Sequence, residues 1–486
     1  MKYFFIISWL PITLNHEVGE LFMRMKYVLC MVLLITGLSG WLALPALAAE
    51  QTSVVQKAET LNLEQVIDRV LANNPLISAA SEEEQRAVAK ERSAWADLLP
   101  KLSTSYAYYH LHDQPYGFFG PAGKIMIGDD DDHTWNITAV QPLFTGLALI
   151  TRRKIAELEI SGRELEKEQL ILELVKKTKV AYARTLLVRR QLEVADREVE
   201  NLAAHVKDAE YLYAQGIIAY NDLLQSKVAL SQAVQHRVQA ESGVDLAIAA
   251  LNMLMNRDIS ALVKIIDPDI QPVVDDNLLT LCGEALGQRP VLRFLRVALK
   301  QAELAIKLAR SQYYPKVSLV GRYEQNGKNI TASENDYRNS DTAAIGVQAD
   351  WTFFEWGKTG DEVRQRIHER EALKHKIENM KNLVQLEVKT AFNHLQVADE
   401  NIKTAAVAVE QARENYRITN LQYQQQVATS TLVLDAATFL SQAENSYYGA
   451  LYGFMISRAE LEWAAGERAN IGIKGITDSA KGVDNG

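Results

Sequence analysis

Two long stretches of this sequence contain no proline. No proline occurs between Pro142 and Pro268, and none follows Pro315 in the chain of 486 residues. A proline inside a helix removes a backbone hydrogen bond and clashes with the preceding turn, so proline-free stretches are where very long helices can form. The sequence therefore permits two helical segments of unusual length.

Within both stretches, apolar residues recur at every seventh position, and a second set follows three places further on. In the first stretch these positions hold Leu192, Val199, Val206, Tyr213, Ala195, Leu202 and Ala209. In the second they hold Val388, Leu395, Ile402, Val409, Tyr416, Tyr423, Ala391, Ala398, Ala405 and Ala412. This spacing is typical of a coiled-coil seam, and its alanines allow close helix packing. We expect helices of about 65 to 70 residues, roughly 100 Å long. They should turn back at Gly216 and at residues 426–430, and the returning helices should end near Asn256 and Gly466.

The sequence also repeats itself in two halves. Two landmarks recur about 215 positions later, Asn74-Pro75 as Arg289-Pro290 and Leu99-Pro100 as Tyr314-Pro315. Two more recur about 210 positions later, Pro142-Leu143-Phe144 as Thr352-Phe353-Phe354 and Ser231-Gln232-Ala233 as Ser441-Gln442-Ala443. A repeat this long indicates a duplicated half rather than a solenoid unit. The change of spacing predicts a longer loop in the first half.

Each half is expected to hold two helices and two strands before its long helix. In the first half, a short helix at 63–74 and a second at 76–99 each end at a proline, which disfavours helical geometry in the residue before it. Residues 316–324 and 343–353 alternate between apolar and polar positions, which predicts strands with one apolar face. The alternation is weaker at 102–108 and 135–139 in the first half.

Composition excludes several classes of protein. The net charge of -9 argues against general nucleic-acid binding, which needs a basic surface. A hydrophobic content of 48% and a charged content of 23% argue against a protein with many membrane-spanning helices. Cys30 and Cys282 are the two cysteines, and Cys30 falls in the N-terminal segment, so no internal disulfide is expected.

The N-terminus has the pattern of a secretion signal. Arg24 and Lys26 precede an apolar run at 27–44, and the small residues at 46–48 offer a cleavage site. We predict a signal peptide at 1–48, with Met25 as a natural start and residues 1–24 as an extension. The chain is therefore expected to leave the cytoplasm.

The expected strands are the right length to cross a membrane. About ten residues suffice for a tilted transmembrane strand. Open strand edges are not tolerated in lipid, because their backbone groups find no water, and known closed barrels begin at about eight strands. Several copies of a four-stranded chain must then share one barrel, or the strands lie outside the membrane. These considerations alone do not choose between two copies and three.

The order of helix, helix, strand, strand, long helix and returning helix, repeated with these landmarks, resembles the TolC-like outer-membrane efflux protein family over about residues 61–466. The resemblance implies a mainly helical fold with membrane strands, in which a homotrimer forms a twelve-stranded barrel continuous with a coiled-coil tunnel. It divides the chain into a first repeat at 49–266, a second at 267–466 and a flexible tail at 467–486.

The same resemblance implies a function. The protein would be the channel subunit of a tripartite efflux or type I secretion system in the bacterial outer membrane, surrounded by lipid and extending into the periplasm. It would passively conduct substrates received from a periplasmic adaptor protein and an inner-membrane pump of the RND, ABC or MFS type. The cargo cannot be identified from the sequence.

The resemblance also assigns roles to residues near the helix turns. Asp435 falls on one of the family's two acidic positions at the tunnel entrance, while Leu432 occupies the other. Carboxylates on a symmetry axis form a negative collar that favours cations; the alternative is a solvated aspartate at a helix start.

Asp222 and Tyr423 match partners that hold neighbouring tip helices closed, but Ala428 replaces the family's arginine in that network. Loss of the cation predicts weaker closure. Gly216 matches a tip glycine near the adaptor contact, although an ordinary turn glycine explains it equally well; Gln426 stands at the matching place in the second half.

No catalytic, cofactor or metal site is predicted, so the protein is not expected to be an enzyme. The run from Asp129 to Asp132, with His133, His110 and His112 nearby, is interpreted as a solvated loop between strands. Gly357-Lys358-Thr359 imitates the end of a phosphate-binding loop, but Thr352 stands where that motif needs glycine. The alternative is a structural coiled-coil envelope protein with an uncleaved N-terminal anchor, which explains the helices but neither the strands nor the duplication.

Overall fold

The computed structural model of the chain describes residues 59–270, 272 and 277–466. The signal peptide expected at 1–48 and the tail expected at 467–486 lie outside these residues. In this described part, no helix is both long and apolar enough to cross a membrane.

The first half follows the predicted order of elements, with two short additions. In chain order it contains β1 (Glu59–Leu61), α2 (Leu63–Asn73), α3 (Pro75–Ala96), β2 (Lys101–His110), β3 (Tyr116–Phe118), the 3₁₀ turn η1 (Gly120–Ala122), β4 (Lys124–Met126), β5 (Asp131–Phe144), α4 (Ala148–Ala214), α5 (Tyr220–Leu254) and β6 (Val263–Ile265). The hairpin of β3 and β4 and the parallel pair of β1 and β6 were not predicted.

The second half repeats the same order. It contains α6 (Leu278–Gln288), α7 (Pro290–Arg310), the 3₁₀ turn η2 (Ser311–Tyr313), β7 (Lys316–Gly327), β8 (Asp341–Asp350), α8 (Lys358–Gln424) and α9 (Ser430–Ala465). α4 and α8 each contain 67 residues, which confirms the expected length.

The duplication is visible in where the elements begin. α2 and α6 begin at residues 63 and 278, which are 215 apart, whereas α4 and α8 begin at 148 and 358, which are 210 apart. The spacing changes between the strands of each pair. The connection at 111–130 is longer than the one at 328–340 and carries the β3–β4 hairpin. The predicted longer loop of the first half is therefore confirmed.

The residue before the landmark proline has the same task in both halves. Asn74 accepts a hydrogen bond from the backbone N–H of Leu76 at the start of α3, and its Nδ2 donates to the carbonyl of Leu254 at the end of α5, 3.0 Å away. The Arg289 guanidinium donates to the carbonyls of Trp463 and Ala464 at the end of α9, at 3.2 and 3.1 Å. Both residues thus donate to carbonyls in the last turn of a helix, where backbone carbonyls lack the usual intrahelical partners.

Four strands form one antiparallel sheet in the order β2-β5-β7-β8. Its register places the predicted apolar positions of all four strands on one face. One row across the sheet consists of Leu102, Ala139, Gly321 and Ile345. The row beside it is polar except for its last member and consists of Ser103, Thr138, Arg322 and Ala344. The sheet therefore has one mainly apolar and one mainly polar face.

The prediction is wrong at two strand ends. Asp131, Asp132 and His133 belong to β5 rather than to the loop, because their backbone pairs with Tyr108 to His110 of β2. The Asp131 carboxylate is also bonded to the Tyr108 hydroxyl and to Nδ1 of His110, each at 2.8 Å. At the other end of the sheet, β8 stops at Asp350 and the expected continuation to Phe353 is not strand.

Two apolar cores lie where the short helices pack on the long ones, and the first of them also includes Tyr452 of α9. In the first half, α2 and the β1–β6 pair cover α4 and α5, with Val66, Leu174, Tyr182 and Met255 fully buried. In the second half, α6 and α7 cover α8 and α9. Burial on the long helices follows the predicted seam: Val388, Leu395, Ile402, Val409 and Tyr423 are all buried.

One seam position is wrong. Tyr213 is 42% exposed, and the neighbouring Leu212 is buried in its place. In α4 the buried face at this end therefore includes the residue before the predicted position, whereas in α8 the predicted Tyr423 stays buried.

Candidate functional site

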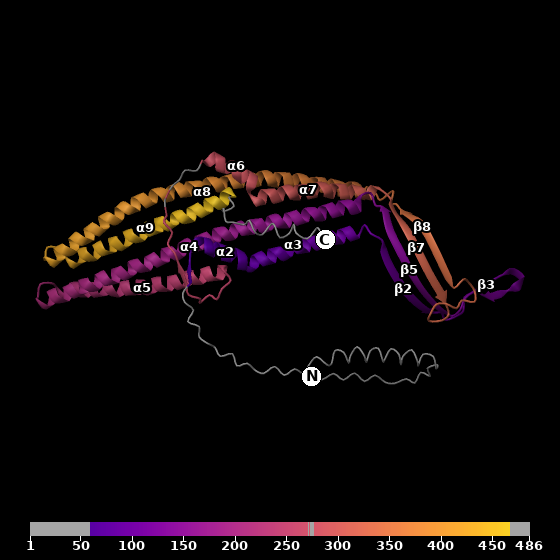
Figure 1. Ribbon diagram of the computed structural model, residues 1–486, viewed down its shortest axis with the longest axis horizontal. Helices are drawn as coiled ribbons and strands as arrows, with labels where there is room; N and C mark the ends of the chain where they lie inside the picture. The colour runs from indigo at the N-terminus through magenta and orange to yellow at the C-terminus, as the bar shows by residue number, and fades with distance from the viewer. Residues whose placement is uncertain (1–58, 271, 273–276, 467–486) are drawn as a thin grey trace, which may run out of the picture. The chain divides into compact units, whose positions relative to one another are not determined.

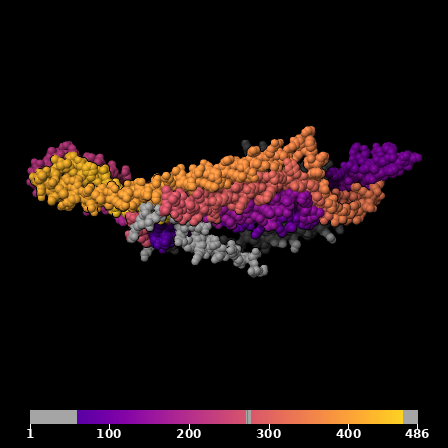
Figure 2. All heavy atoms as spheres, turned by 90° about the horizontal axis from the view of Figure 1, so that it is seen from above, coloured from indigo at the N-terminus to yellow at the C-terminus, as the bar shows by residue number. Residues whose placement is uncertain are grey.

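The two turns that join the long helices to the returning helices form the candidate entrance site. The α4–α5 hairpin and the α8–α9 hairpin end side by side, away from the strands (Figure 1), and their tips also lie together in the space-filling view (Figure 2). Each turn contains one residue in the left-handed region, Gly216 (φ 72°) and Gln426 (φ 64°). In both turns this residue donates its N–H three residues back, to Tyr213 and to Tyr423. Such bonds satisfy the last helical carbonyls.

Gly216 fits its turn and leaves its surroundings open. A side-chain atom added there would meet nothing within 4 Å, so space does not require glycine, but the positive φ favours it. The residue is exposed at the tip of the described part of the chain. Its geometry accounts for the turn, and its exposure leaves the predicted adaptor contact as a proposal.

Asp435 lies in the second turn of α9. Its side chain is exposed, and within the described residues it forms no hydrogen bond or ion pair. Leu432, at the other position of the predicted acidic pair, is 53% exposed on the same helix. A single chain therefore presents one unpaired carboxylate on α9 near the tip.

Tyr423 is buried, whereas Asp222 is half-buried in the first turn of α5. The Tyr423 hydroxyl has no hydrogen-bond partner within the described chain, so the predicted bond to Asp222 is not formed within one chain. Burial raises the pKa of Tyr423 above its usual value, and the carboxylates of Asp208 and Asp222 act in the same direction. The ring packs in an apolar cluster with Leu212 and Val433.

Ala428 borders the same apolar cluster. It is half-buried and packs against the residues around Tyr423. A methyl group therefore stands where the resemblance predicts a cation, and it packs against this apolar cluster.

Sequence reasoning missed three polar residues beside Tyr423. The His205 ring of α4 lies against the Tyr423 ring, tilted by 52° with centroids 4.6 Å apart, and its Nε2 lies 2.8 Å from the Ser430 hydroxyl of α9. The Ser430 hydroxyl lies 2.9 Å from the hydroxyl of Ser226 on α5. The position of His205 directly before the seam residue Val206 could have indicated that it is buried. The sequence gives no comparable indication for Ser226 and Ser430, because they lie on other helices.

The other candidate surface is the strand sheet and its junction with the helices. Large aromatic side chains are exposed where β8 passes into α8, namely Trp351 (59%), Phe353 (80%), Phe354 (63%) and Trp356 (90%). Exposed aromatic residues that border an apolar band are typical of the interface regions of membrane barrels. The apolar face of the sheet is therefore suited to lipid and the polar face to water.

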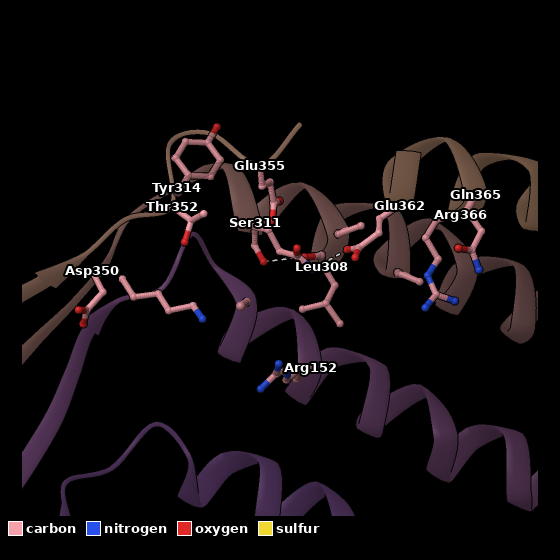
Figure 3. Close-up of a pocket in the computed structure, with 15 residues that line it drawn as sticks. Arg152, Leu308, Ser311, Tyr314, Asp350, Thr352, Glu355, Glu362, Gln365 and Arg366 are labelled. Carbon is pink, nitrogen blue, oxygen red and sulfur yellow. Dashed lines mark hydrogen bonds between the residues drawn. The ribbon is translucent and has the colours of Figure 1, made fainter. Parts of the chain in front are cut away.

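A cavity of ≈ 670 Å³ lies where the polar side of the sheet meets the helices (Figure 3). Lys316 and Asp350, which are paired across β7 and β8, border it together with Arg152 of α4 and Glu362 and Arg366 of α8. The polar face thus continues into a charged lining on the helical part. In the described part of the chain, this cavity included, no group of three or more His, Cys, Asp or Glu residues is placed to hold a metal ion.

A two-faced antiparallel sheet joined to paired helices of this length defines an outer-membrane channel subunit. The chain belongs to the outer membrane efflux protein family, whose model matches residues 66–257 and 281–467. It is a non-enzymatic efflux channel of the bacterial outer membrane with a tunnel on the periplasmic side. Family membership favours this function over a structural coiled-coil protein.

Three similar proteins illustrate the relationship. Outer membrane protein TolC of Salmonella enteritidis is 21% identical over 426 residues, which cover 85% of this chain and 83% of that protein. Outer membrane protein TolC of Escherichia coli (strain K12) is 20% identical over 418 residues, which cover 83% and 82%. The solved CmeC outer membrane channel of Campylobacter jejuni superposes with a TM-score of 0.72 at 17% identity, covering 83% and 85%.

Proposed function

We propose that three copies of this chain form one duct that carries substrates passively from the periplasm to the exterior, within a tripartite efflux or type I secretion system. In this proposal the residues 49–266 and 267–466 act as two repeats, and each copy supplies four strands to a twelve-stranded barrel. A periplasmic adaptor and an inner-membrane pump of the RND, ABC or MFS type deliver the cargo and supply the energy.

The observation that carries the proposal is the four-stranded sheet with two open edges. Within the described residues, β2 and β8 each pair on one side only. An open edge in lipid leaves backbone groups without partners, which costs several kcal/mol per group. Because β2 and β8 run in opposite directions, β8 of one copy can pair antiparallel with β2 of the next. Repetition of this contact closes a ring.

The entrance follows from the same assembly. Around a threefold axis, the three Asp435 carboxylates would form one negative collar, because Leu432 supplies no second ring. Such a collar favours cations and offers a binding site to multivalent cations. Gly216 and the exposed hairpin ends around it would face the adaptor.

The test measures single-channel currents of the purified protein in a planar lipid bilayer. We expect ion-conducting channels that prefer cations and are blocked by multivalent cations added on the tip side. Asp435→Asn should lower the cation preference and weaken the block at least several-fold, because the collar charge is removed.

Asp245→Asn is the matched control. Asp245 is an exposed aspartate further along α5, so the substitution removes the same charge away from the tip. It should leave the block unchanged. Absence of any channel would contradict the duct, and equal block in Asp435→Asn and the parent would contradict the collar alone.

A further inference from the structure

Four side chains, one from each tip helix, meet in a buried polar cluster. They are His205 of α4 (2% exposed), Ser226 of α5 (0%), Tyr423 of α8 (2%) and Ser430 of α9 (3%). His205 and Ser226 belong to the α4–α5 hairpin, and Tyr423 and Ser430 belong to the α8–α9 hairpin. The cluster therefore joins the two hairpins through polar contacts, and it lies beside the apolar clusters around Leu202 and Leu212.

The hydrogen bonds of the cluster fix where the imidazole proton lies. The Ser226 hydroxyl donates to the backbone carbonyl of Asp222 at 3.0 Å, so it can only accept from Ser430. The Ser430 hydroxyl has then used its hydrogen, and it must accept one from Nε2–H of His205. Nδ1 of the neutral ring is consequently the free basic nitrogen. It is buried and has no partner within the described chain.

Protonation of His205 at Nδ1 is therefore unfavourable while the hairpins are packed. The new Nδ1–H would have no acceptor, and burying a charge without a partner is costly. The titratable groups near the cluster are Asp208 of α4, Asp222 of α5, and Tyr416 and Tyr423 of α8. Among the described residues, α9 faces the cluster with the neutral Ser430. Burial lowers the pKa of His205 below its usual value, and Asp208 opposes this shift.

Protonation and hairpin separation are then linked. When the hairpins separate, water reaches the imidazole and its pKa returns to about 6.5. The packed hairpins bind the proton less tightly than the separated hairpins. The free energy that favours packing is therefore fully present above about pH 6.5 and decreases as the pH falls below that value. The effect is limited to about tenfold per pH unit per chain.

We propose that His205 is a proton-sensitive latch between the α4–α5 and α8–α9 hairpins, so that acidification of the periplasm loosens the tip and opens the entrance. The opening of the entrance rests on the proposed duct function, whereas the separation of the two hairpins does not. The latch exists once per chain, because the equivalent of His205 in the second half, 210 positions later, is the exposed Asn415.

The first test compares channel opening at about pH 7.5 and about pH 5.5. The parent should open at least several-fold more readily at the lower pH, with an upper limit of about tenfold for each chain that takes up a proton. His205→Gln retains a side-chain N–H donor for Ser430 but cannot take up a proton, so it should lose this dependence. The matched control His236→Gln removes an exposed histidine of α5 and should keep it. Equal pH dependence in His205→Gln and the parent would overturn the latch.

A second readout does not depend on conduction. Spin labels at Val228→Cys of α5 and Phe439→Cys of α9, both exposed positions, report the separation of the hairpins in a Cys282→Ser background. We expect a longer and broader distance distribution at low pH, absent when His205→Gln is added. An unchanged distribution overturns the latch, whereas a changed distribution without any channel currents contradicts the duct and leaves the latch supported.

Ser430→Ala decides the outcome if His205→Gln fails to assemble. It removes the acceptor of Nε2–H and leaves a buried donor unpaired, so the labelled hairpins should already be further apart at about pH 7.5. If Ser430→Ala leaves the distances of the parent unchanged at both pH values, the polar cluster does not hold the hairpins together and the proposal fails.

Discussion

Gly216 and Gln426 end the two long helices in the same left-handed conformation but with different side chains. For an L-residue with a Cβ this conformation costs roughly 1–2 kcal/mol, and glycine avoids that cost while losing more entropy on folding. Gln426→Gly should therefore stabilise the α8–α9 turn by about 0.5–1 kcal/mol, measured by denaturant unfolding of the detergent-solubilised protein.

The neighbouring residue provides the control for this prediction. Gln425 has a φ of -86°, which needs no glycine, so Gln425→Gly should destabilise the protein. If Gln426→Gly lowers the free energy of unfolding as Gln425→Gly does, the left-handed turn is not strained.

At this scale the sequence predicted some side chains and not others. The burial of Tyr423 followed from the seven-residue pattern, because one helix face determines it. Tyr213 has the same place in the first half, yet it is exposed and packs on Tyr220 with ring centroids 5.3 Å apart. The contacts of His205 could not be predicted, since Ser226 and Ser430 become its neighbours only when separate helices pack.

At the scale of the elements, the C-terminal end of α9 packs against the buried guanidinium of Arg289. Arg289 is 3% exposed, donates to two α9 carbonyls and to Glu387, and its guanidinium lies 4.3 Å from the centre of the Trp463 ring. Arg289→Ala should leave the Ala464 carbonyl without a partner, while the Trp463 carbonyl keeps the N–H of Gly466. The last turn of α9 should be destabilised by about 1–3 kcal/mol. Hydrogen exchange of the backbone amides at 460–465 should become faster.

A substitution of Glu387, the ion-pair partner of Arg289, distinguishes the effect of the charge pair from that of the carbonyl contacts. The Glu387 side chain is 41% exposed, so its ion pair with Arg289 is partly screened by water. Glu387→Gln should therefore change the exchange rates at 460–465 much less than Arg289→Ala. Similar effects from both substitutions would mean that the charge pair, rather than the carbonyl contacts, holds the helix end.

Element types were more predictable than their ends. The long helices were readable because prolines bound them and a regular pattern fills them. β5 was underestimated: its alternation is weak, yet it has 14 residues because β2 and β7 pair with it on both sides. The β3–β4 hairpin shows no alternation, and it lies within the longer first loop that the change of spacing predicted.

At the scale of the whole molecule, the open edges at β2 and β8 allow the assembly of several copies to be tested by cross-linking. We expect a chain with Ser103→Cys on β2 and Ala344→Cys on β8, in a Cys282→Ser background, to be cross-linked between copies by a short bis-maleimide reagent. Denaturing gels should then show covalent dimers and trimers, because a closed ring of three offers no further edge. Either cysteine alone should form no such ladder.

Other band patterns would contradict this assembly. Only monomers in membranes would mean that β2 and β8 do not meet between copies, and species larger than three would mean that the ring does not close at three. The count of copies is the part of the fold that one chain leaves open, since two copies would also satisfy every strand edge.

The 210-residue spacing between α4 and α8 has a consequence for any protein that binds the hairpin ends. Three chains with two hairpins each would surround the axis with six similar docking positions. These positions are only nearly equivalent, because one kind carries Gly216 and the exposed Tyr213, and the other carries Gln426 and the buried Tyr423. A partner protein would meet two alternating kinds of position, and it must bind either three of one kind or six with two different contacts.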